Sequence, residues 1–186
     1  MAKAALIHKL TRPNAPLRDS AHVLLLRMQE MMEWSVTIRD PRQVAELHNM
    51  RIAAKRLRYT MELFAPCFGK DFSRSMKIAE DIQESIGRIH DCDMLIPLLK
   101  KTVEKETKRE QKQALRKGGA LPQFLAAEGL VALLTDKQAD RVRLYDAFIV
   151  FWDKLPPEGF LEQLTQIVYP DAGKADTGTS SEGKNH

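Results

Sequence analysis

Apolar residues recur at spacings of three and four along most of the chain, and this period decides what it can fold into. The first clear example follows Pro16, a residue that suits the first turn of a helix. Its members are Leu17, Ala21, Leu24, Leu25, Met28, Met31, Met32 and Ile38. Such spacings place apolar side chains on one face of an α-helix, and no segment alternates as a half-buried strand does. The sequence therefore predicts an all-α bundle of about six helices.

Prolines and glycines mark the expected helix ends. Asp40 can cap a second helix, with Pro41 in its first turn, and Pro66 stops that helix after Ala65. Asp71 can cap a third helix, in which Phe72 and Met76 begin the apolar period. Downstream we expect a solvated helix or linker over 100–119, a short helix over 121–134, a longer one over 136–155 and a last one over 160–168.

The helices are expected to form one domain, residues 16–169. Residues 1–15 are expected to be a loose arm. Residues 170–186 consist mainly of glycine, serine, threonine and charged residues. Such a composition cannot bury a core, so a disordered tail is predicted there.

The overall charge permits an anionic partner but does not require one. Lys and Arg number 29 against 25 Asp and Glu, which gives a formal charge of +4 and a pI of about 9.1. The two cysteines, Cys67 and Cys92, lack metal-ligand spacing and are expected to be reduced. No apolar run reaches the roughly 18 residues that span a bilayer, and no secretory signal is evident. We therefore expect a cytoplasmic protein.

The distribution of charge is more informative than its sum. On a helical wheel of the second helix, one arc of roughly 100° is apolar and should face the core. It holds Leu47, Met50, Ala54, Leu57, Met61 and Phe64. A second arc of roughly 80° holds a basic stripe, which consists of His48, Arg51, Lys55 and Arg58. Arg56 lies roughly 120° from the middle of that arc.

The stripe has two interpretations. Like charges three and four residues apart repel, so a helix that needed only solubility would alternate signs. A binding face for an extended anion accounts for the pattern. A solvated face with carboxylates supplied by another helix accounts for it too.

The third helix carries polar residues on its apolar side. If the helix continues past Gly87, Gln83 and His90 are seven residues apart on the same face, and burying them without partners would cost about 1–3 kcal/mol each. His90, Asp91 and Asp93 follow one another closely. They could form a metal or acid–base centre, or a hydrogen-bonded network that supports the stripe.

Taken together, these segments resemble one known family. "LHNMRIAAKRLRYTMELFAPCFG" followed by "IQESIGRIHDCDMLIPLL" is similar to the conserved histidine α-helical domains, the CHAD family. The match comprises His48, Arg51, the group Lys55-Arg56-Leu57-Arg58, and Ile86-Gly87 through Asp93, and it covers roughly residues 44–99.

The resemblance implies an all-helical fold with a basic cavity that binds inorganic polyphosphate, as a binding module without a cofactor. Some members associate with polyphosphate granules. It assigns the ligand face to His48, Arg51, Lys55 and Arg58. Typical members have two helical halves that face each other across the cavity, whereas one clear copy of the motif is present here. Arg141 and Arg143, the cations of segment 100–117, or a second chain could supply the opposite wall.

Two other functions stay open from the sequence. A metal-dependent phosphohydrolase would use His48, His90, Asp91 and Asp93, although a dense carboxylate set is lacking. A nucleic-acid-binding module is the second alternative. Tyr59 is predicted to lie off the stripe, and the lack of an aromatic set along it disfavours a single-stranded nucleic-acid groove.

Overall fold

The computed structural model describes residues 3–4, 16–116, 126–155 and 157–170, and the regular structure within them is entirely helical. The elements, with η for 3₁₀-helix, are η1 (Leu17–Ser20), α1 (His22–Met32), η2 (Thr37–Arg39), α2 (Val44–Phe64), η3 (Ala65–Cys67), α3 (Lys70–Arg116), α4 (Ala126–Lys154) and α5 (Pro157–Val168). The predicted all-α fold is confirmed, with five α-helices where about six were expected. None of the described helices is long and apolar enough to cross a membrane. The predicted disordered tail, apart from Pro170, and all but two residues of the N-terminal arm lie outside the described residues.

The first helix is shorter than its apolar pattern suggested. A single helix from Leu17 to Ile38 was expected, but η1, α1 and η2 are separate, and turns join the last two. The run Val36-Thr37-Ile38 lies beyond the end of α1, and its β-branched side chains disfavour a further helical turn because they lose χ1 freedom in a helix. Ile38 is nevertheless fully buried, so its apolar character is used by the core.

The second helix begins later than expected. Asp40 and Pro41 do not open it, because the Asp40 carboxylate closes a local turn instead. It accepts hydrogen bonds from the backbone N–H of Arg42 at 3.0 Å and from the Arg42 guanidinium. The helix starts at Val44 and ends at Phe64, and Pro66 lies in the following 3₁₀ turn, as the proline predicted.

The third helix is one continuous element of 47 residues. It runs through Gly87 and Pro97 and includes the charged segment up to Arg116. Of the two expectations for that segment, solvated helix or linker, the described part is helix. The expected helices over 121–134 and 136–155 are likewise joined, since α4 is unbroken from Ala126 to Lys154. No proline or glycine stands between Leu134 and Asp136 to separate them.

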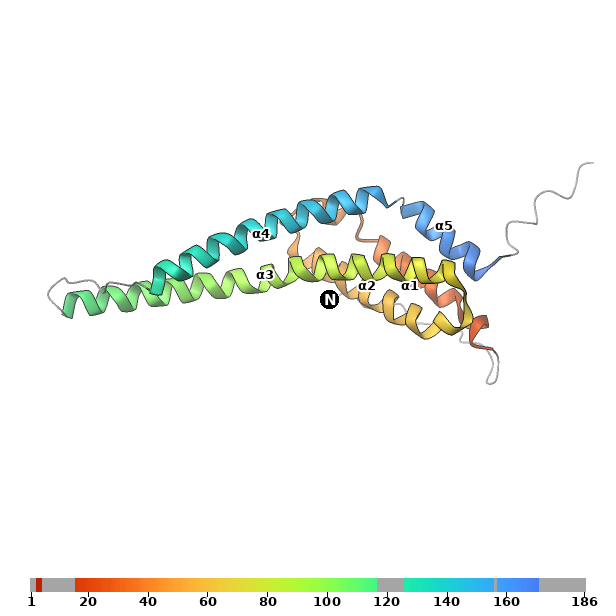
Figure 1. Cartoon of the computed structure of the whole chain (residues 1–186), viewed down its shortest axis with the longest axis horizontal. Coiled ribbons are helices and arrows are strands. Elements are labelled where there is room, and N and C mark those ends of the chain that lie inside the picture. Colours follow the sequence, from red (N-terminus) through yellow and green to blue (C-terminus); the bar gives the residue numbers. More distant parts are fainter. Residues whose placement is uncertain (1–2, 5–15, 117–125, 156, 171–186) are drawn as a thin grey trace, which may run out of the picture.

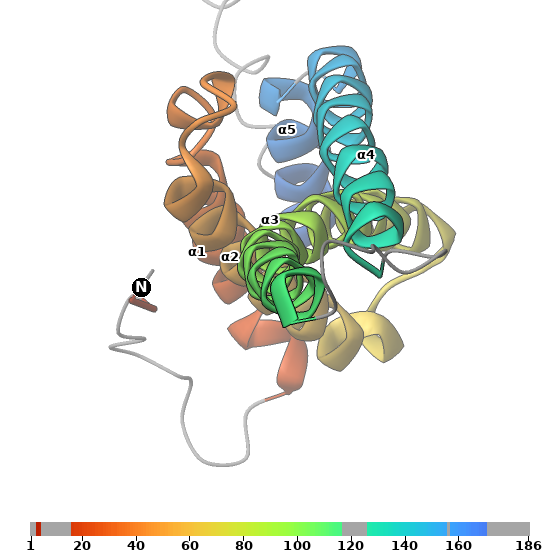
Figure 2. The same ribbon diagram turned by 90° about the vertical axis from the view of Figure 1, so that its left-hand side faces the viewer.

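α2 packs against α1 and α3, and α4 returns along α3 (Figure 1). α5 turns back toward α1, so the five helices enclose a core at one end of the molecule (Figure 2). All six apolar residues predicted for the inner face of α2 are buried. The distal half of α3 continues past α1 and α2 with α4 beside it (Figure 1).

Candidate functional site

The buried face of α2 fixes where its basic residues point. Because Leu47, Met50 and Ala54 lie in the core, the neighbouring arc stands at the edge of the contact with α3. His48, Arg51 and Arg58 are half-buried there, and Lys55 is exposed. This basic stripe, called the α2 stripe from here on, therefore runs along the side of α3.

Arg51 lies over Gly87 of α3. A Cβ atom placed on Gly87 would stand 3.8 Å from the Arg51 Nε, which is ordinary van der Waals contact. The glycine thus leaves the space that a longer side chain would fill, and the arginine head occupies it. Gln83 and His90 lie roughly one turn before and after Gly87 on the same side of α3.

Two histidines meet at the end of the stripe. The rings of His48 and His90 stack with centroids 4.9 Å apart. Burial, together with the charges of His90 and Arg51, lowers the pKa of His48 below its ordinary value. His48 is therefore neutral at neutral pH in the free protein, and a nearby anion would favour its protonation.

Three buried polar atoms around Gly87 have no hydrogen-bond partner among the described residues. They are the Arg51 Nε, the Gln83 Oε1 and the His90 Nδ1. Buried donors and acceptors are satisfied in the great majority of native structures. Two of these atoms, on Arg51 and His90, can donate to an anion. The arrangement fits an anionic ligand at this point.

The exposed end of the stripe contains an aromatic ring. The Lys55 Nζ and the Arg58 Cζ lie 5.5 and 5.2 Å from the centre of the Tyr59 ring, within cation–π range. The prediction that Tyr59 lies off the stripe is therefore wrong, because its ring spans the gap between these two cations. Arg58 also pairs with Glu62 at 2.9 Å, one turn further along α2. Arg56, predicted to lie on another side, is half-buried and has contacts of its own.

Comparison with known protein families shows which family the chain belongs to. The family model of the CHAD domain matches residues 2–100. The chain belongs to the CHAD family. The match includes α1, α2 and most of α3, and it stops before the distal part of α3. No curated protein and no solved structure matches the chain.

The carboxylates of the CHAD motif point in different directions. The Asp93 Oδ1 accepts a hydrogen bond from the Arg141 Nε at 2.9 Å, and both side chains are 11% exposed. Asp91 is exposed, and its Oδ1 stands 3.7 Å from the His90 Nδ1. Asp93 therefore faces α4, while His90 faces α2. Within the described chain, no three His, Cys, Asp or Glu side chains are placed to hold a metal ion together.

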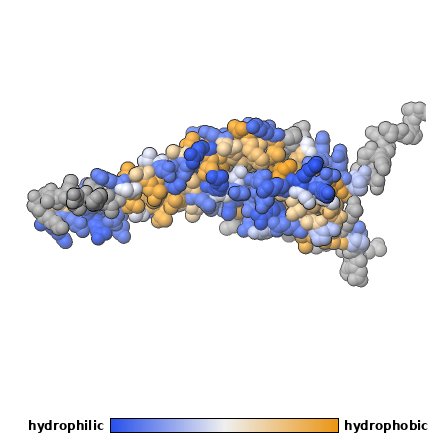
Figure 3. Space-filling view, in the orientation of Figure 1, coloured by the Kyte–Doolittle hydropathy of each residue, from blue (hydrophilic) through white to orange (hydrophobic). Residues whose placement is uncertain are grey.

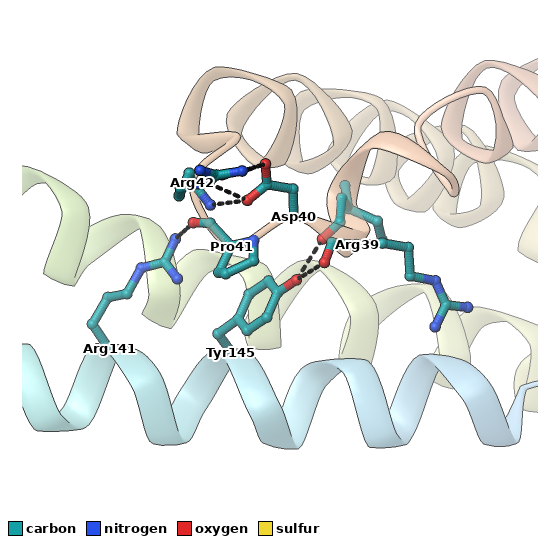
Figure 4. Close-up of polar contacts among 7 residues, drawn as sticks. Arg39, Asp40, Pro41, Arg42, Arg141 and Tyr145 are labelled. Carbon is teal, nitrogen blue, oxygen red and sulfur yellow. Dashed lines mark hydrogen bonds and ion pairs between the residues drawn. The ribbon is translucent and has the colours of Figure 1, made fainter.

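Arg141 and Tyr145 join α4 to the turn before α2 (Figure 4). Arg141 donates to the Pro41 carbonyl at 2.8 Å, and the Tyr145 hydroxyl lies 2.9 and 2.8 Å from the carbonyls of Ile38 and Arg39. Sequence reasoning missed this contact, since carbonyl acceptors in a turn leave no pattern. Tyr59, in contrast, follows Lys55 by four residues, a spacing that could have indicated their contact.

The basic motif of α2 has no facing copy on α4. Of the α4 cations considered for an opposite wall, Arg141 is held by Asp93, and Arg143 forms an ion pair with Asp140. The cationic segment of α3 does not face the α2 stripe either. It is the distal continuation of α3 and lies beyond the end of α2 (Figure 1).

Proposed function

We propose that this protein binds inorganic polyphosphate without chemically changing it, and that the α2 stripe is the binding surface. One observation carries the proposal: the buried Arg51 Nε and His90 Nδ1 lack hydrogen-bond partners in the described chain, and the exposed Lys55 follows Arg51 one turn along α2. A phosphate chain offers oxygen acceptors and negative charge and has no base edges to recognise. Arginine and lysine recognise such a ligand by charge-assisted hydrogen bonds.

The membership of the CHAD family supports the same ligand class. The binding residues we assign are His48, Arg51, Lys55 and Arg58, with Gln83 and His90 beside them. We assign Asp93 to the contact between α3 and α4, because it pairs with Arg141. Asp91 stands next to His90, with its Oδ1 3.7 Å from the His90 Nδ1.

Single substitutions test the stripe. A charge-assisted hydrogen bond contributes roughly 1.5–3 kcal/mol, so Arg51→Gln or Lys55→Gln should weaken polyphosphate binding by about tenfold or more. Arg74→Gln is a matched control, because that side chain is 79% exposed and lies on another side of α3. It should change the affinity by less than about threefold through screened electrostatics. Equal losses in all three variants would mean diffuse attraction and would contradict an oriented site.

Catalysis is tested in the same preparation. A metal-dependent phosphohydrolase would shorten polyphosphate in Mg²⁺ or Mn²⁺ and stop when the metal is chelated. The pairing of Asp93 with Arg141 disfavours that alternative, because it removes one of the four expected ligands. We expect unchanged chain length on a gel under all these conditions.

A single-stranded nucleic acid is the second candidate ligand. The observation that favours it is the Tyr59 ring between Lys55 and Arg58, since bases stack on exposed aromatic rings. Competition at equal phosphate concentration separates the two ligands. We expect polyphosphate to displace RNA, and Tyr59→Leu to weaken polyphosphate binding by less than about threefold. Tighter RNA binding that is lost in Tyr59→Leu would favour the nucleic acid.

We further propose a cytoplasmic location, with association with polyphosphate granules where these form. A fluorescent fusion should coincide with stained granules, and Arg51→Gln should reduce that overlap. Pairing of two chains could bring two stripes together. Sedimentation with and without polyphosphate would test it, and a monomer in both conditions would exclude pairing.

A further inference from the structure

The distal half of α3 carries a second set of cations on one side of the helix. On a wheel at about 100° per residue, they fall within an arc of roughly 100°. This distal stripe consists of Lys101, Lys105, Lys108, Arg109, Lys112 and Arg116. Five of them, all but Lys101, line one open hollow together with Gln113. The space-filling view shows a strongly hydrophilic surface at this end of the molecule (Figure 3).

The negative charges of this segment lie on other sides of the helix. Glu104, Glu106 and Glu110 all fall outside the arc of the distal stripe. The Glu110 Oε1 accepts a hydrogen bond from the backbone N–H of Ala127 at 3.1 Å, at the start of α4. Glu106 pairs with Arg109 at 3.2 Å, the one ion pair that a distal-stripe cation makes within the described residues.

Such separation of charge is unfavourable for a helix that needs only to be solvated. Cations three and four residues apart repel one another, and carboxylates at the same spacing would relieve that repulsion. Here Glu110 is turned toward α4 and Glu106 pairs with Arg109 alone. Glu104, which is four residues before Lys108, forms no ion pair within the described residues. A polyanion bound along the stripe would relieve the repulsion instead.

The distal stripe lies in register with the proposed binding site. Gly87, over which Arg51 lies, falls in the middle of the same arc of α3. Between the two sites the arc holds Met94 and Leu98, which are both uncharged and exposed, and the exposed Asp91 stands at its edge. At about 1.5 Å per residue, Lys105 stands roughly 27 Å and Arg116 roughly 44 Å along the axis from Gly87.

We propose that the polyanion site continues along α3 from the α2 stripe to the distal stripe, so that the protein prefers chains long enough to reach both. This inference rests on the proposed function, because the α2 stripe is its first half. A long chain held at the α2 stripe presents its remainder to the distal stripe at high effective concentration. A short chain cannot bridge the uncharged gap at Met94 and Leu98.

The test compares tripolyphosphate with long-chain polyphosphate on the full chain. The distal variant combines Lys105→Gln, Lys108→Gln and Lys112→Gln, all at exposed positions and all to a good helix former. The control variant combines Lys70→Gln, Arg88→Gln and Lys154→Gln, which are also exposed and remove the same charge elsewhere. Circular dichroism checks that both variants keep their helices.

We expect the distal variant to weaken long-chain binding by at least tenfold and tripolyphosphate binding by less than twofold. Its affinity for the long chain should also depend less on salt, with the slope of log K against log salt reduced by about two. The control variant should change both affinities by less than about threefold. Equal effects of the distal and control variants on the long chain would overturn the inference.

The proposed function fails in a different way. If Arg51→Gln binds both polyphosphates as tightly as the unaltered protein does, or if that protein binds neither, the α2 stripe is not a polyphosphate site. If Arg51→Gln weakens both while the distal variant behaves like the control, the site exists but ends before Met94.

Discussion

The rings of His48 and His90 stack across the contact between α2 and α3, with their planes 28° apart. The stack joins the first residue of the α2 stripe to the CHAD motif of α3. Burial of His48, then the charges of His90 and Arg51, lower the pKa of His48 in the free protein. An anion at the stripe would act in the opposite direction.

Polyphosphate binding should therefore depend on pH through His48. The bound anion raises the pKa of His48, so the complex takes up a proton near neutrality. The gain in affinity is fully present below the pKa of the free protein and is lost as pH rises through the pKa of the complex. Calorimetry in buffers of different ionisation enthalpy should detect the proton. His48→Gln should flatten the profile, and an unchanged profile would assign the titration to another group.

The same histidine should affect stability in the opposite sense. Its folded pKa is lowered from an unfolded value of about 6.5, so the unfolded chain binds more protons. Stability should rise with pH up to about 6.5 and fall as pH drops through the folded pKa. Urea titrations of the unaltered protein and His48→Gln should differ in this window, and parallel curves would contradict the lowered pKa.

Gly87 offers a pair of substitutions that separate stability from binding. Gly87→Ala should raise the free energy of unfolding by about 0.5–1 kcal/mol, because the new Cβ meets Arg51 at an ordinary distance and alanine favours a helix. Gly129→Ala, in open space on α4, should stabilise similarly and leave binding unchanged. Gly87→Leu should displace the Arg51 head and weaken polyphosphate binding about tenfold. Full binding by Gly87→Leu would mean that this space is not part of the site.

Glu62 competes with the ligand for Arg58. Their ion pair is 2.9 Å long and partly exposed, so a polyanion must displace the carboxylate. Glu62→Gln should tighten polyphosphate binding by a few fold, whereas Glu128→Gln, exposed at the start of α4, should have little effect. In an Arg58→Gln background the benefit of Glu62→Gln should disappear. If it persists, the benefit comes from net charge alone.

The Asp93–Arg141 pair should contribute to stability and leave binding alone. Removing one member strands a largely buried charge, so Asp93→Ala should cost about 3 kcal/mol in urea unfolding. Asp93→Leu combined with Arg141→Met should cost less than the sum of the single changes. Weaker polyphosphate binding by folded Asp93→Ala would return Asp93 to the ligand site.

Local patterns were enough for much of the fold. The period of three and four predicted the all-α architecture, and the apolar arc of α2 predicted six residues that are all buried. Turn chemistry was less reliable, since Asp40 and Pro41 looked like a helix start. The Asp40 carboxylate accepts a hydrogen bond from the backbone N–H of Arg42. A helix cap and a local turn would both satisfy this N–H, so the residues alone do not distinguish them.

The continuity of the long helices could not be predicted from local sequence patterns. Gly87 and Pro97 are ordinary signals for a helix end, yet α3 passes through both. α3 packs against both α2 and α4, and its contact with α2 continues past Gly87, where His90 stacks on His48. Tertiary packing of this kind overrides residue preference because it contributes more than the few kcal/mol at stake.

The sequence by itself determined the helical class, the buried face of α2 and the presence of a basic arc beside it, because these depend on residues a few positions apart in one helix. Only the tertiary structure decided what meets that arc. It brought His90 against His48 and Gly87 beneath Arg51, and it turned Asp93 toward Arg141. The physical reason is that these pairs depend on the rotation of one helix against another, which the packing of the whole core sets.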